Sequence, residues 1–165
     1  MFNMLFIQLL GLIAFVLLFI SYFKEDIDGV LLMQVISGIF YALHYYFLSA
    51  YSALFVIIFE LIRDYSYYRT DLDRYIFIGT IPIYLIYAVF MFDGVISLLP
   101  IVSSVIDGYG LAISKKTAVI GAMISETLWF VYDLSCLSYA GVISEIFLIG
   151  SYIFVLFKDS KGFSK

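Results

Sequence analysis

GVLLMQVISGIFYALHYYFLSAYSALFVIIFELIRDYSYY (residues 29–68) decides the fold of this chain. A transmembrane helix needs about 20 mostly apolar residues, so this stretch is long enough for two. A weak break at residues 49–52 divides it, and basic residues bound it, Lys24 on one side and Arg69 on the other. The stretch therefore predicts a hairpin of two membrane-spanning helices.

The composition of the whole chain agrees with a membrane protein. Of its 165 residues, 64% are hydrophobic and only 13% are charged, whereas about a quarter of the residues of a soluble domain are charged. No cluster of Lys and Arg is large enough to indicate nucleic-acid binding. We therefore expect the lipid bilayer as a partner and no nucleic acid.

Three further apolar runs follow outward from the first. Residues 2–23 are one span in length, and residues 75–113 and 117–157 are each long enough for two. These two runs are broken near Asp93-Gly94, a turn dipeptide, and near residues 135–138. One single span and three hairpins predict an all-α membrane protein with seven transmembrane helices.

The basic residues test this count independently. With seven helices, every Lys and Arg falls at one side of the membrane: Lys24, Arg63, Arg69, Arg74, Lys115, Lys116, Lys158, Lys161 and Lys165. Lys and Arg concentrate in cytoplasmic loops, so we expect the N-terminus outside and the C-terminus in the cytoplasm. A six-helix arrangement would break this pattern.

Seven helices in this orientation predict a 3+1+3 organisation, in which the fourth helix inverts the chain between two parallel three-helix bundles. The expected parts are a first bundle (1–69), a connecting loop with a linker helix (70–93), a second bundle (94–157) and a cytoplasmic tail (158–165). A shift of 88 residues aligns Ile36-Ser37 with Ile124-Ser125, Tyr51 with Tyr139, and Ile58-Phe59 with Ile146-Phe147. These identities are few for so apolar a chain, so the topology carries the inference.

Ionisable residues inside the spans are the first candidates for a site. An ionisable side chain near mid-membrane costs roughly 2.5 to 3.5 kcal/mol on insertion scales, so it tends to face the bundle or a cavity. Glu60 and Glu126 lie deep in the third and sixth spans, and Glu145 lies in the outer third of the seventh. We expect these three acids to bind solute or protons; the alternative is that they are protonated structural residues.

Two polar and aromatic stripes accompany the acids. Gln34, Ser37, Tyr41 and His44 recur at helical spacing in the second span, and Ser125, Trp129 and Tyr132 do so in the sixth. Such stripes predict an interior that is wet or binds a polar ligand. Two alternatives stay open, because Tyr41 and His44 also fit interfacial anchors and Trp129 also fits packing. Asp133, near the outer end of its span, is interpreted as solvated.

Backbone features of the fifth span indicate mobility. Pro100, placed in mid-span, permits a kink, and Gly108 follows it, so both are candidate hinge residues; a static kink is the alternative. Enzyme chemistry is not expected, because one His and one Cys provide neither a nucleophile–base pair nor a metal cage. We expect no catalytic residue, metal or cofactor, and no P-loop is present.

The segment LLMQVISGIFYALHYYFLSAYSALFVIIFELIRDYSYY (31–68), together with LWFVYD (128–133) and SYAGVISEI (138–146), resembles the YgjV-type bacterial inner-membrane proteins. That family is similar, more distantly, to the SWEET sugar transporters, the PQ-loop proteins and the PnuC transporters. The resemblance implies the bacterial inner membrane and two parallel three-helix bundles joined by a linker helix. In SWEET-like relatives a tryptophan and asparagines line the central pocket. Trp129 matches the tryptophan, but Asp133 stands where asparagine is expected.

Two function classes follow. The first is a carrier of a small polar solute, at most of monosaccharide or nucleoside size, with alternating access between the bundles. The second is a non-transporting scaffold or sensor whose buried acids set helix packing. The substrate, the coupling ion and the oligomeric state, including a homo-oligomer, are left open.

Overall fold

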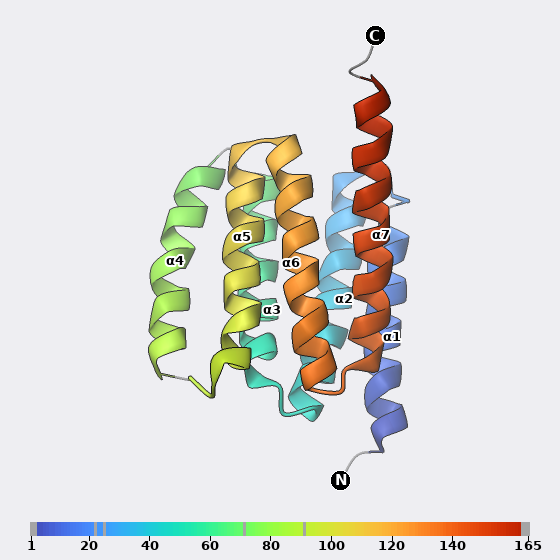
Figure 1. The fold of residues 1–165 in the computed structure, drawn as a ribbon, viewed down its shortest axis with the longest axis vertical. Coiled ribbons are helices and arrows are strands. Elements are labelled where there is room, and N and C mark those ends of the chain that lie inside the picture. Colours follow the sequence, from blue (N-terminus) through green and yellow to red (C-terminus); the bar gives the residue numbers. More distant parts are fainter. Residues whose placement is uncertain (1–2, 22, 25, 71, 91, 163–165) are drawn as a thin grey trace.

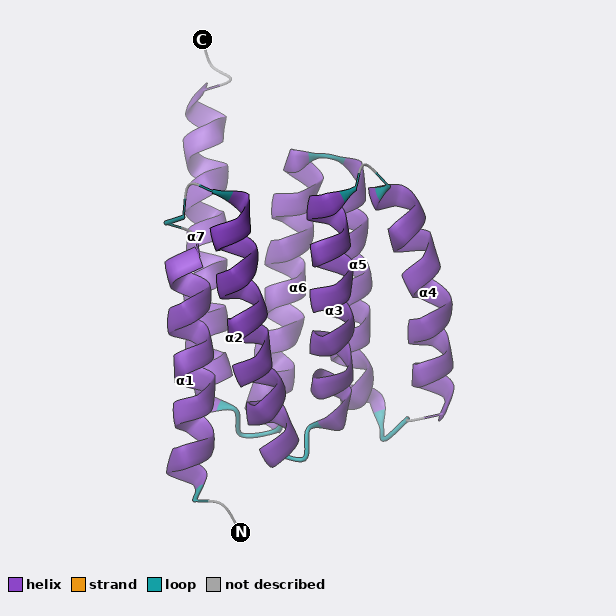
Figure 2. Ribbon diagram, turned by 180° about the vertical axis from the view of Figure 1, so that it is seen from behind, coloured by secondary structure: helices purple, strands orange, loops and turns teal. Residues whose placement is uncertain are grey.

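The computed structural model describes residues 3–21, 23–24, 26–70, 72–90 and 92–162, without the side chains of residues 27, 67–68, 73, 115 and 158–162. Within these ranges all regular structure is helical (Figures 1 and 2). The elements are α1 (Met4–Ser21), α2 (Ile27–Phe47), α3 (Tyr51–Arg69), α4 (Asp73–Phe90), the short 3-10 helix η1 (Val95–Leu98), α5 (Leu99–Ile113), α6 (Lys115–Ser135) and α7 (Tyr139–Gly162). The predicted all-helical fold is confirmed for the described chain.

Most of these helices have the length that a bilayer requires. All α-helices except α5 contain 18 to 24 residues, or about 27–36 Å at 1.5 Å per residue. The hydrocarbon core of a bilayer is about 30 Å thick. Four segments are both long and apolar enough to cross it: Met4–Ser21, Asp28–Phe47, Val95–Ile113 and Tyr139–Phe157. Arg74–Phe90 is apolar but shorter.

The distribution of polar residues is inverted relative to a soluble protein. Large apolar side chains such as Leu5, Val89 and Phe154 are 66–76% exposed. In contrast, His44 and Asp133 are fully buried. Water favours the opposite arrangement, so the outer surface of this fold suits lipid.

Six helices close into a ring and α4 lies outside it. The neighbouring pairs around the ring are α1–α2, α2–α3, α3–α5, α5–α6, α6–α7 and α7–α1. Helix α4 packs against α3 and α5 (Figure 1). Helices α2 and α6 therefore approach each other across the middle of the ring, where the functional candidates gather.

Successive helices run in opposite directions, which separates the connections into two ends (Figure 1). We call the upper end in Figure 1 the basic end; the last turns of α1, α3, α5 and α7 and the first turns of α2, α4 and α6 lie there. The lower end, with the connections at 48–50, 91–94 and 136–138, is the far end. The described basic side chains near the helix ends, Lys24, Arg69, Arg74 and Lys116, all lie at the basic end. The side chains of Lys115, Lys158, Lys161 and Lys165 lie outside the described residues.

Helices α2 and α3 match α6 and α7 at the 88-residue shift suggested by the sequence. The bounds of α2 and the start of α3 fall on those of α6 and α7. Asp26 and Ser114 each accept a hydrogen bond from the backbone N–H three residues on. The two far-end turns also correspond: Ser49 and Leu137 both have φ 60. Positive φ is uncommon outside glycine, so its occurrence at both equivalent positions marks one shared turn geometry.

The expected mid-span position of Pro100 is wrong. Pro100 occupies the first turn of α5 rather than mid-span. Proline is tolerated there because the N–H that it lacks has no partner within the helix, so Pro100 requires no kink. The proline inside a helix is Pro82, in α4. At the C-terminus, α7 continues to Gly162, into the segment assigned to a tail from residue 158.

Candidate functional site: a polar cavity inside the helix ring

A cavity of about 560 Å³ lies inside the ring, lined by residues of α1, α2, α3, α5, α6 and α7. Its lining runs from Tyr45 and Trp129 toward residues such as Tyr65 and Ala118, which lie close to the basic end. Tyr65 is 49% exposed. The cavity therefore opens toward the basic end.

Six of the predicted site residues line this cavity: Ser37, Tyr41, Glu60, Glu126, Trp129 and Glu145. They come from α2, α3, α6 and α7, so residues more than 100 positions apart meet in one space. Helical spacing put the right faces of α2 and α6 inward. His44 and Tyr132, predicted on the same stripes, do not line the cavity and lie beyond its far end.

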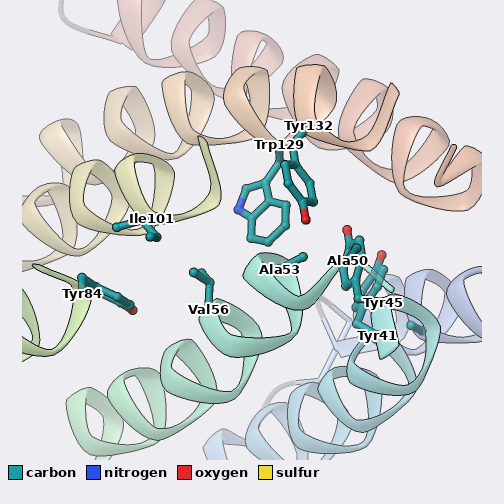
Figure 3. Close-up of a cluster of buried hydrophobic side chains, with 10 residues drawn as sticks. Tyr41, Tyr45, Ala50, Ala53, Val56, Tyr84, Ile101, Trp129 and Tyr132 are labelled. Carbon is teal, nitrogen blue, oxygen red and sulfur yellow. The ribbon is translucent and has the colours of Figure 1, made fainter. Parts of the chain in front are cut away.

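Aromatic rings form the far wall of the cavity. Tyr41 and Tyr45 come from α2, and Trp129 comes from α6 on the opposite side, with Tyr132 of α6 packed against it outside the cavity (Figure 3). The ring centroids of Tyr45 and Trp129 are 5.8 Å apart, and those of Trp129 and Tyr132 are 5.9 Å apart in an edge-to-face arrangement. Such pairs contribute about 0.5–1.5 kcal/mol each beyond their buried area. The wall is thus built from both halves of the chain.

Glu145 is the most enclosed of the cavity acids. It is 7% exposed, and its Oε1 lies 3.5 Å from the Ser144 hydroxyl. Its Oε2 is buried and has no hydrogen-bond partner in the described part of the chain. A buried polar atom without a partner costs free energy, and a group that donated a hydrogen bond to Oε2 would offset that cost.

A hydrogen-bond network closes the far end. The Tyr45 hydroxyl donates to Asp133 Oδ1 at 2.9 Å, which joins α2 to α6. His44 Nδ1 lies 2.7 Å from the Ile7 carbonyl oxygen, and its Nε2 lies 2.8 Å from Ser138 Oγ. A carbonyl oxygen only accepts, so His44 carries its proton on Nδ1 in this contact. His44 therefore links α1, α2 and the turn before α7 rather than shaping the cavity.

Gln8 adds a second link at the same end. Its Nε2 donates to the Leu137 carbonyl oxygen at 2.8 Å, and its Oε1 accepts from the Ala140 N–H at 2.9 Å. Both amide ends of one α1 side chain are thus satisfied by the turn between α6 and α7. The sequence analysis did not select Gln8, and an amide within an apolar span was the signal that was available.

The interpretation of Asp133 as solvated is wrong. Its side chain is fully buried, held by Tyr45, with Oδ2 against the backbone of α7. A Cβ at Gly141 would lie 1.9 Å from that Oδ2 and 2.5 Å from Ser138 Oγ. Glycine at position 141 therefore lets α7 approach close enough to cover the carboxylate. The position of Asp133 near a helix end in the sequence could not show that α7 packs over its carboxylate.

Arg63 organises the cavity wall near the basic end. It is 2% exposed, and its guanidinium contacts Asp64 at 2.8 Å and Asp107 at 2.7 Å. It also donates to the carbonyl and hydroxyl oxygens of Ser104 at 2.8 and 3.0 Å. The Tyr84 hydroxyl lies 2.8 Å from the same Ser104 hydroxyl. One arginine thus ties α3 to α5, and through Ser104 to α4.

Gly108 belongs to this arginine contact. A Cβ at this position would lie 3.1 Å from Arg63 Nη1, so glycine leaves room for the guanidinium. The structure gives Gly108 this packing role, and its predicted hinge role stays a prediction. Arg63 had been counted only as a basic-end charge, although its place six residues before the end of α3 was a signal of burial.

Two serines at equivalent positions hold neighbouring helices together. Ser37 Oγ donates to the Ala14 carbonyl oxygen at 2.7 Å, joining α2 to α1. Ser125 Oγ lies 2.6 Å from Ser103 Oγ, joining α6 to α5. Interhelical bonds of this kind stabilise membrane helix packing. Among the described residues, no group of three His, Cys, Asp or Glu side chains is placed to hold a metal ion.

Comparison with known proteins gives one match. Residues 5–162 match the Imp-YgjV family, described as a bacterial inner membrane protein. No curated protein and no solved structure matches the chain. The match covers nearly all of the described helices, and it agrees with the apolar exterior and the four helices that are able to cross a membrane. The chain therefore belongs to the Imp-YgjV family of bacterial inner membrane proteins.

Proposed function

We propose that this protein is a membrane carrier for a small polar solute. All seven helices cross the bilayer, with the N-terminus outside and the C-terminus in the cytoplasm. Two three-helix units, α1–α3 and α5–α7, are joined by α4 and move against each other to give alternating access. The basic end then faces the cytoplasm, in accord with the concentration of Lys and Arg in cytoplasmic loops.

The internal correspondence at 88 residues supports the two-unit organisation. The two units have the same neighbours around the ring. The contacts α1–α2 and α2–α3 in the first unit correspond to α5–α6 and α6–α7 in the second, and the contact α3–α5 between the units corresponds to α7–α1. Ser37 and Ser125, one shift apart, make the equivalent contacts to α1 and α5. Parallel repeats related by an axis along the membrane normal are a known carrier architecture.

The observation that carries the proposal is the unequal closure of the cavity. At the far end Tyr45 of one unit bonds Asp133 of the other, and these two positions are themselves one shift apart. They therefore meet where an axis relating the units would pass. Toward the basic end the lining reaches Tyr65, which is 49% exposed, and we infer that the cavity opens there. A space closed at one end by breakable polar contacts and open at the other has the form of one state of an alternating-access cycle.

Counterflow uptake in proteoliposomes tests this proposal. The panel consists of labelled monosaccharides, nucleosides, vitamin precursors and amino acids. The variant Glu145→Gln removes the carboxyl group of Glu145 while keeping the shape of the side chain. Asp28→Asn is the matched control, because Asp28 lies outside the cavity in an exposed pair with Arg69. We expect one solute to exchange in the wild type and in the control, but not in Glu145→Gln.

The opposite result has a defined meaning. Absence of exchange across the panel, together with a lower unfolding temperature for Glu145→Gln, would favour a scaffold or sensor whose acids only set helix packing. Loss of exchange with an unchanged unfolding temperature favours the carrier.

A further inference from the structure

The charges around the cavity are unbalanced. Its lining contains one guanidinium, that of Arg63, and five carboxylates, those of Glu60, Asp64, Asp107, Glu126 and Glu145. Asp64 and Asp107 are already paired with Arg63. In the described part of the chain, neither Glu126 nor Glu145 is in a salt bridge. The cavity is thus rich in acidic groups that have no basic partner among the described residues.

Glu145 supplies a second, independent feature. Its Oε2 is buried and unpartnered among the described residues, and Glu126 is its neighbour in the same cavity. A buried carboxyl pair requires a proton or a cation to offset its desolvation. A neutral solute supplies hydrogen bonds but no charge, and an anionic solute would be repelled.

The aromatic wall completes a site for a cation. Trp129, Tyr41 and Tyr45 line the same cavity as these acids. The faces of aromatic rings attract ammonium groups, tryptophan most strongly. Ca²⁺ and Mg²⁺ are a poorer fit, because they take six or more oxygen ligands, and no group of three His, Cys, Asp or Glu among the described residues is placed to hold a metal ion.

We propose that the solute is a small organic cation whose ammonium group lies between the carboxylates of Glu126 and Glu145 and the rings of Trp129 and Tyr41. This inference rests on the carrier function proposed above and names its substrate class. A cavity of about 560 Å³ lies within the usual range of small-molecule sites, so an alkylammonium or choline-sized cation fits with room for water.

Trp129 is the only tryptophan in the chain, so its fluorescence reports directly on this cavity. Choline and its uncharged carbon isostere dimethylbutanol form one probe pair, and butylammonium and butanol form another. Titration of the purified protein with each probe compares the charged and uncharged members at equal size. We expect the cations to change Trp129 emission saturably and the alcohols to have no such effect.

Variants locate the charge that is responsible. Glu145→Gln and Glu126→Gln are expected to weaken cation binding at least about tenfold, because hydrogen bonds to charged groups are among the stronger polar contacts. Glu145→Asp, which keeps the charge, is expected to retain much of the affinity. Asp28→Asn is the carboxylate-to-amide control outside the cavity. Equal affinity for cations and alcohols, or cation binding that survives both Gln variants, would overturn the inference.

Counterflow with labelled choline and butylammonium separates this inference from the carrier function. Exchange of a cation supports both. Exchange of neutral solutes without any cation overturns the substrate class and leaves the carrier in place. Saturable cation binding without any exchange keeps the cation site and removes the carrier function.

Discussion

Tyr45→Phe removes one hydroxyl group from the far-end network and leaves the aromatic ring in place. The lost bond, 2.9 Å from the Tyr45 hydroxyl to Asp133 Oδ1, is buried and joins the two units. Interhelical hydrogen bonds in membrane proteins average about 0.6 kcal/mol and reach about 1.7 kcal/mol. A bond made only in the far-end-closed state therefore shifts the equilibrium toward the open state by about 3- to 20-fold when it is lost.

Labelling of a single cysteine measures this shift. Cys136 is the only native cysteine, so Cys136→Ser provides a clean background for Ala122→Cys, which lines the cavity. In intact cells a membrane-impermeant thiol reagent reaches that cysteine only through an opened far end. We expect its labelling rate to rise about 3- to 20-fold in Tyr45→Phe, and labelling in inverted vesicles to be fast with or without the substitution.

Tyr46→Phe is the matched control, because Tyr46 is the next residue on α2 and is 53% exposed. Its loss of a hydroxyl should leave labelling from outside unchanged. An unchanged rate in Tyr45→Phe, with normal labelling in inverted vesicles, would refute the reasoning that the bond between Tyr45 and Asp133 closes the cavity.

Three further outcomes test the packing and the orientation. Gly141→Ala should lower the free energy of unfolding by about 1–3 kcal/mol, because the added Cβ would overlap Asp133. Gly150→Ala is the control and should be neutral or stabilising, because a Cβ at that position would have nothing within 4 Å. Thermal unfolding in detergent compares the two variants. Arg63→Ala should lower the free energy of unfolding by about 3–5 kcal/mol by breaking a buried ion pair. Arg69→Ala breaks an exposed pair and should have little effect. Equal losses in denaturant unfolding would contradict this burial argument. A fluorescent protein fused to the C-terminus should fold and emit, and a periplasmic phosphatase fused there should be inactive; the reverse pattern would invert the proposed orientation.

The hydropathy pattern was sufficient for the class of fold because the bilayer imposes a length and excludes unpaired backbone groups. The hairpin in residues 29–68 appears as α2 and α3 with a turn at 48–50. The 88-residue correspondence was weak in identities, and in the structure the bounds of α2 and α6, their N-caps and the turns after them also agree with it. Helix caps and turns depend on backbone hydrogen bonds and dihedral angles, and different residue types can adopt the same ones. Ser49 and Leu137, for example, have the same φ of 60° although they are different residues.

Helical spacing also identified several of the cavity-lining residues. It placed Ser37, Tyr41 and Trp129 on inward faces because residues three or four apart lie on one side of a helix. The same spacing also predicted His44 and Tyr132, three residues further along each helix, which do not line the cavity. Periodicity shows which face of a helix points inward, but it does not show where along the helix a cavity ends.

The sequence by itself determined that this is a helical membrane protein with its basic residues at one end and with acids inside the helices. Those properties depend on length, hydropathy and charge, which are local. Only the tertiary structure decided that Asp133 and Arg63 are buried and that the cavity is closed at one end and open at the other. These properties depend on contacts between helices that are distant in the chain, such as Tyr45 with Asp133 and Arg63 with Asp107. No local pattern specifies such a contact, because it requires the packing of the whole ring.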